Sequence, residues 1–140
     1  MSQTNAKPTP KETPETAHYW AGIAQSELRL QRCQACSRAY FYPRPSCPHC
    51  FSSDVVWEVA SGRGRLHTYL LNFRAAPGFE GDVPYAIAIV ELEEGPRMMS
   101  NIVGVDNTPQ NLVLDMALEV EFQQRGEGTV PVFRPAGSAP

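Results

Sequence analysis

The chain has 140 residues, a length that suits one average domain or a small metal-held module joined to a compact sheet domain, but not a large enzyme scaffold. Hydrophobic residues make up 42% and charged residues 19%, and no apolar run approaches the roughly 20 residues that a membrane span needs. The net charge of −3 argues against a general polyanion binder.

The first 26 residues predict a tail followed by a short helix. Residues 1–16 contain three prolines and mostly polar side chains, so we expect them to be disordered. In residues 17–26 the apolar side chains Tyr19, Trp20 and Ile23 recur near helical spacing. Such a helix either packs on the core or docks on a partner, and core packing is the favoured use.

Four cysteines follow a strand predicted over residues 27–32. Cys33 and Cys36 form one pair, and Cys47 and Cys50 form a second pair ten residues later. A two-residue gap lets both sulfurs of a pair approach one metal ion, and two such pairs complete a tetrahedral four-sulfur site. All four positions would be protein ligands, so we predict a structural zinc ion that drives folding of residues 28–53.

Two other uses of the cysteines remain open. Iron accepts the same four ligands, and two disulfides are also possible. The N-terminal residues lack the pattern of a secretory signal, so we expect a cytoplasmic protein, where disulfides are rare. Aromatic residues between the two pairs, Tyr40, Phe41 and Tyr42, could form a minimal core or present a surface.

The remaining chain reads as a series of short strands with one long loop. We predict strands over residues 55–60, 65–73, 85–92, 97–103, 117–124 and 129–133, with the loop over residues 74–83. No substantial helix separates them, so a small antiparallel barrel of the OB type fits better than a sheet with crossover helices. The expected organisation is a helix and ribbon over residues 17–53, a barrel over 54–135 and a frayed tail over 136–140.

An ordered set of motifs resembles one known family. The set is Tyr-Trp in the helix, Leu-Gln-Arg-Cys, Phe-Tyr-Pro-Arg-Pro between the cysteine pairs, Gly-Arg-Gly at residues 62–64, Val-Pro-Tyr-Ala-Ile-Ala at 83–88 and Leu-Glu-Glu-Gly-Pro-Arg at 92–97. These resemble the rubredoxin-like zinc-ribbon plus OB-fold proteins associated with acyl-CoA metabolism. The family commonly has a glycine before its last long strand, where this chain reads Asp115-Met116-Ala117.

The resemblance implies a mainly β protein that accompanies a larger enzyme. Members accompany thiolase-superfamily enzymes, related lyases or CoA-ester hydratases, and the larger partner carries the catalytic residues. The implied zinc ligands here are Cys33, Cys36, Cys47 and Cys50. Beyond those, we predict that Arg63, Arg65 and Arg74 contact CoA or another anion, since arginine binds phosphate through two hydrogen bonds at once. The predicted partner interface comprises Tyr19, Trp20, Ile23, Tyr40, Phe41, Tyr42 and Phe79.

Two other functional classes compete with the accessory subunit. A nucleic-acid-binding module is the alternative, because zinc ribbons and OB barrels both bind nucleic acids, although the acidic second half counts against it. An independent enzyme lacks support, because His18, His49 and His67 have no nucleophile or carboxylate companion at useful spacing. The basic stretch from Leu28 to Arg74 fits either an anionic partner or arginines that offset the negative zinc–thiolate centre.

Overall fold

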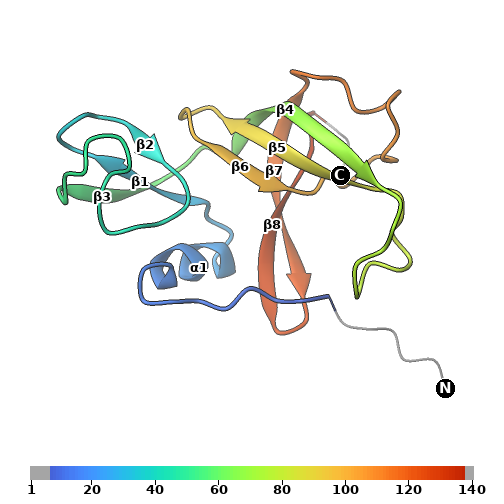
Figure 1. Cartoon of the computed structure of the whole chain (residues 1–140), viewed down its shortest axis with the longest axis horizontal. Helices are drawn as coiled ribbons and strands as arrows, with labels where there is room; N and C mark the ends of the chain where they lie inside the picture. Colours follow the sequence, from blue (N-terminus) through green and yellow to red (C-terminus); the bar gives the residue numbers. More distant parts are fainter. Residues whose placement is uncertain (1–6, 138–140) are drawn as a thin grey trace.

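The computed structural model describes residues 7–137, which form one helix and two β-sheets (Figure 1). The smaller sheet lies at one end of the molecule, and the larger sheet curls at the other end. Helix α1 (Ala17–Ala24) contacts β1 of the smaller sheet and β8 of the larger one. The helix therefore joins the two sheets.

The smaller sheet carries the cysteine region. Its central strand β1 (Arg29–Cys33) pairs antiparallel with β2 (Ala39–Tyr40) and with β3 (Val55–Val59). The pairing of Cys33 with Val55 returns the chain to β1 directly after the second cysteine pair. For this reason β3 belongs to the ribbon sheet, whereas the sequence places residues from 54 onward in the barrel.

The larger sheet has five antiparallel strands. They are β4 (Arg63–Asn72), β5 (Tyr85–Leu92), β6 (Arg97–Ser100), β7 (Ala117–Arg125) and β8 (Gly128–Pro135), in the spatial order β6-β5-β4-β7-β8. A parallel bridge between Ile102 and Phe133 brings the two ends of the sheet together. The sheet is thus curled toward a barrel, and the predicted fold, a mainly β chain with an N-terminal helix, a ribbon and an OB-type barrel, is confirmed.

One hydrophobic core spans the helix and the barrel. Tyr19 and Ile23 of α1 and Leu30 of β1 belong to the same buried cluster as Leu66 and Phe133 of the barrel. A second, much smaller cluster contains Cys33, Tyr40 and Cys47. The helix and the start of the ribbon are therefore held by the barrel, while the metal end of the ribbon has few apolar contacts of its own.

Gly62 and Asp115 are among the residues with positive φ where the barrel turns. Gly62 has φ +81°, and a Cβ atom there would lie 2.6 Å from Cγ1 of Val120. Asp115 has φ +69° and donates its backbone N–H to the carbonyl of Leu66. Aspartate tolerates this conformation better than most residues, so the turn forms without a glycine at this position.

Several predicted boundaries differ in detail from the structure. The helix ends at Ala24 and not at residue 26, and Ser26 has φ +60°, which stops the helix. β4 begins at Arg63, two residues earlier than expected. The predicted disordered tail falls partly outside the described residues, as do residues 138–140 of the predicted frayed tail. Residues 7–16 lie within the described part, and Lys7 forms an ion pair with Asp82.

Candidate metal centre and the surfaces around it

The four cysteines converge at the end of the ribbon. Cys33 ends β1, Cys36 follows one turn later, and Cys47 and Cys50 lie in the loop before β3. The Sγ atoms of Cys33 and Cys50 are 3.5 Å apart, and those of Cys36 and Cys47 are 3.6 Å apart. All four sulfurs lie within 4.8 Å of one another, and all four residues are free cysteines.

Backbone amides point toward the sulfurs, as expected for metal-binding turns. The N–H of Cys36 donates to Sγ of Cys33 at 3.4 Å, and the N–H of His49 donates to Sγ of Cys47 at 3.3 Å. Burial raises the pKa of the Cys47 thiol, but hydrogen bonds from the backbone amides of Cys50 and His49 and from the thiols of Cys36 and Cys33 outweigh this effect. The pKa of Cys47 therefore falls to about 7. These amides therefore favour the thiolate form of Cys47, the form that binds metal.

The geometry fits a tetrahedral zinc ion. Zinc–sulfur bonds of ~2.3 Å at tetrahedral angles separate neighbouring sulfurs by about 3.8 Å, close to the two Sγ–Sγ distances of 3.5 and 3.6 Å. Cys33 and Cys47 are buried, and the four sulfurs leave no ligand position for water or substrate. The site is therefore closed, as in structural zinc sites.

The residues around the site show where the nearby positive charge lies. Arg38 approaches Nδ1 of His49 at 3.4 Å, and the hydroxyl of Tyr40 donates to the carbonyl of Arg44 at 2.8 Å. Arg32 instead pairs with Glu58 across the sheet at 2.9 Å. Exposed Arg38 thus lies beside His49 of the second cysteine pair, where its charge suits the offset of a negative metal centre.

The arginines predicted to contact an anion do not all share one site. Arg63 and Arg65 of β4 line an open groove of about 770 Å³. Arg74 lies beyond the other end of β4. The ten residues of this strand span about 30 Å at the usual rise per strand residue. Arg65 also pairs with Glu91 at 2.6 Å, which holds the pKa of that carboxyl below its ordinary value.

The groove carries both signs of charge. Its other lining residues are Gly64, Glu91, Leu92, Glu93, Gly95, Ala117, Leu118, Glu119 and Ala136. Glu91 is neutralised by Arg65 and Arg97, and Glu119 pairs with Arg134 at 3.0 Å. Arg63 forms no ion pair with any described residue, so its guanidinium is the one that can accept an added anion without losing a partner.

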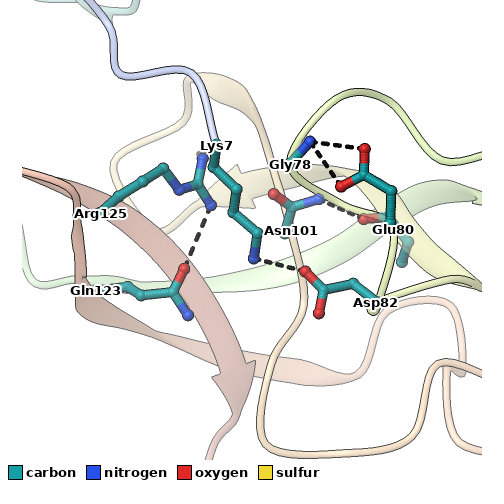
Figure 2. Close-up of polar contacts among 8 residues, drawn as sticks. Lys7, Gly78, Glu80, Asp82, Asn101, Gln123 and Arg125 are labelled. Atoms are coloured by element: carbon teal, nitrogen blue, oxygen red, sulfur yellow. Dashed lines mark hydrogen bonds and ion pairs between the residues drawn. The ribbon is translucent and has the colours of Figure 1, made fainter. Parts of the chain in front are cut away.

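The loop over residues 74–83 is held against the N-terminal segment (Figure 2). Its Asp82 pairs with Lys7, and its Glu80 accepts the backbone N–H of Gly78. The Phe79 ring stacks on Tyr85 at 4.8 Å between centroids, and Lys7 lies 4.8 Å from the Phe79 centroid. No local sequence pattern predicts the contact between Lys7 and Asp82, because the two residues lie about 75 positions apart.

The predicted interface residues divide into interior and surface groups. Tyr19, Ile23 and Tyr40 are only 1–3% exposed, so their side chains pack within this chain. Trp20, Phe41 and Phe79 are half-buried, and Tyr42 is 39% exposed. The aromatic rings of Tyr19, Phe41 and Tyr42 pack edge to face. A role in a partner interface stays a prediction for the whole set, and only the second group offers surface.

The three histidines lie apart from one another. His18 packs on Trp57 at 4.6 Å between ring centroids, and His49 lies beside Arg38. His67 is exposed on β4 at an irregularity in the β4–β5 pairing.

Across residues 7–137, no helix is long and apolar enough to cross a membrane.

Comparison with known protein families matches both parts of the chain. The rubredoxin-like zinc ribbon domain of ChsH2 matches residues 20–56, and the C-terminal OB-fold domain of ChsH2 matches residues 57–123. Together with the four clustered sulfurs, the zinc-ribbon match confirms the predicted structural zinc ion.

Individual relatives span all or part of the same architecture. The "Probable enoyl-CoA hydratase alpha subunit" of Thermomonospora curvata is 36% identical over 132 residues, which are 93% of this chain but only 40% of that protein. A "DUF35 domain-containing scaffold protein" of Methanothermobacter thermautotrophicus is 36% identical over 81% of this chain and 86% of its own length. A solved structure described as "Ltp2-ChsH2(DUF35) aldolase" is 34% identical, with a TM-score of 0.78 over 91% of this chain and 99% of that chain.

Proposed function

The chain belongs to the ChsH2 family, in which a rubredoxin-like zinc ribbon precedes an OB-fold domain, and we propose that it is an accessory subunit of an acyl-CoA enzyme. The observation that carries this proposal is the match over almost the whole chain to the structure described as "Ltp2-ChsH2(DUF35) aldolase", whose description joins two protein names. The hydratase relative is likewise described as a subunit. The partner we propose is a thiolase-superfamily enzyme or a related lyase or hydratase.

The zinc supports this role by fixing the ribbon and not by chemistry. Its four ligands are all protein sulfurs, so the ion holds the loops between β1 and β3 in one arrangement. The ribbon in turn sets the positions of Phe41 and Tyr42 relative to the helix. We infer that the exposed part of this aromatic group and the loop over residues 74–83 face the partner.

We propose that the groove beside Arg63 receives the phosphate end of a CoA ester, which the partner then encloses. Arg63 is exposed and unpaired among the described residues, and Arg65 could release Glu91 to Arg97 when an anion arrives. Three glutamates in the lining make the groove a poor site for a long polyanion. This charge pattern favours a single phosphorylated ligand over the alternative, a nucleic acid.

The test is reconstitution. The tagged chain is expected to co-purify from its native host with a thiolase-like or hydratase enzyme, and the separately expressed partner is expected to turn over its acyl-CoA ester faster when the chain is added. Turnover by the isolated chain, or a partner whose activity is the same without it, would overturn the proposal. Binding of single-stranded DNA or RNA with a steep salt dependence would favour the nucleic-acid module.

The CoA contact has its own internal control. Arg63→Glu is expected to raise the KM of the complex for its CoA ester without preventing assembly, because the residue is exposed at the groove. Arg74→Glu changes the same charge at the far end of β4 and is expected to have the smaller effect. Equal effects of the two reversals would remove the groove as the CoA site.

A further inference from the structure

The N-terminal residues 7–10, which we call the strap, bridge two separate parts of the barrel. At its first residue, Lys7 pairs with Asp82 of the 74–83 loop, with 2.5 Å between Nζ and Oδ2. The Lys7 ammonium also lies over the ring of Phe79, and the Arg125 guanidinium of β7 lies 5.5 Å from the centroid of the same ring. The strap and Arg125 together hold the loop through one aromatic ring and one carboxylate.

At its other end, the strap lies on the turn between β7 and β8. The Thr9 hydroxyl approaches the carbonyl of Arg125 at 3.5 Å. A Cβ atom on Gly128 would lie only 2.9 Å from Cγ2 of Thr9, so the strap fits here because that residue has no side chain. Thr9 and Pro10 also line a small cavity with Trp20, whose indole nitrogen is buried without a hydrogen-bond partner.

We propose that residues 7–10 are a releasable strap that fastens the 74–83 loop to the β7–β8 hairpin and covers the surface around Phe79 and Trp20. An exposed ion pair such as Lys7–Asp82, with 29% and 45% of the two side chains accessible, changes an equilibrium by about two- to fivefold. The strap is nevertheless favoured because α1 anchors the chain after residue 16, which keeps the strap at high local concentration.

Release would change two surfaces at once. The Phe79 ring would lose Lys7, and the cavity beside Trp20 would open toward solvent. Both residues belong to the predicted partner interface, so a partner that contacts them must compete with the strap. This consequence rests on the proposed function, whereas the fastening of the loop does not.

The experiment measures amide hydrogen exchange in the full chain. The reporters are the loop amides of Phe79 and Asp82, which donate to backbone carbonyls within the loop, and the amide of Gly78, which donates to Glu80. Lys7→Gln is expected to speed their exchange about two- to fivefold. The matched control is Lys11→Gln, because Lys11 is exposed and forms no ion pair with a described residue.

Two further variants keep the test specific. Asp82→Asn is expected to reproduce the effect of Lys7→Gln, and the double variant is expected to add nothing to either. Gly128→Ala acts from the opposite side, because its methyl group displaces Thr9 while the backbone of Gly128 suits alanine. It is expected to speed loop exchange and to change the fluorescence of Trp20 in a Trp57→Phe background.

Loop exchange that matches wild type in both Lys7→Gln and Gly128→Ala overturns the proposal, as does an equal increase in the Lys11→Gln control. Additive effects of Lys7→Gln and Asp82→Asn also overturn it, because they would show that the two residues act separately. None of these readouts requires a partner. A failure of the accessory-subunit function would therefore leave the measurement of the strap intact.

Discussion

Removal of zinc is expected to unfold the metal end of the ribbon and to leave the barrel folded. In the structure the buried hydrophobic cluster at the metal end consists of Cys33, Tyr40 and Cys47. Burial of these side chains contributes on the order of 5 kcal/mol. Ordering the backbone of residues 34–54 costs about 1 kcal/mol per residue, or roughly 20 kcal/mol. Zinc binding, worth ~10–16 kcal/mol in zinc-finger peptides, supplies the difference.

The barrel and helix should survive because they share a separate core. Tyr19, Leu30 and Phe133 lie in one buried cluster that contains no cysteine. The assay is amide exchange of the Cys47→Ser variant, with zinc content measured in parallel and Ser46→Ala as the neighbouring control. Exchange is expected to become rapid over residues 34–54 and to remain slow in β4, β5 and β7.

Either of two results would refute this reasoning. Loss of protection throughout the barrel would show that the ribbon and barrel fold as one unit. Full protection of residues 34–54 in a metal-free sample would show that apolar packing alone orders the ribbon. Zinc content near one ion per chain in the wild type is the accompanying expectation, because the four clustered cysteines are the only cysteines of the chain.

Substitutions at three other positions test the barrel by denaturant unfolding. Leu66 is 0% exposed, so Leu66→Ala should lower the free energy of unfolding by about 2–5 kcal/mol. A loss below ~1 kcal/mol would show that Leu66 is not a core residue. Asp115→Val should destabilise by about 1–2 kcal/mol, while Asp115→Gly should be neutral or stabilising, because only the first is strained at φ +69°. Arg65 lowers the pKa of Glu91 from its ordinary value of 4.5. The ion pair therefore stabilises the fold above pH 4.5, and this stabilisation is lost as the pH falls below 4.5 through the lowered pKa of Glu91. Arg65→Gln should remove that part of the acid sensitivity, and an unchanged pH profile would contradict the pairing.

The sequence alone determined the metal site, the fold class and the order of the parts. Cysteine spacing is a local property, because two residues between ligands fix how a turn presents its sulfurs whatever the rest of the chain does. Alternating apolar residues likewise reported strands such as β5, where every second side chain is buried. The ordered motifs then identified the family, and the structure and comparisons confirmed it.

Tertiary structure alone decided which distant residues meet. The pairing of β3 with β1, the burial of Tyr19 against the barrel, and the separation of Arg74 from Arg63 depend on strand register and closure, which no local window contains. The strap is the clearest case. Its polar, proline-rich composition predicts disorder, yet Lys7 lies against Asp82 because the barrel holds the long loop beside the N-terminal segment. Composition describes what a segment can bury by itself, and not the surface that a folded neighbour offers it.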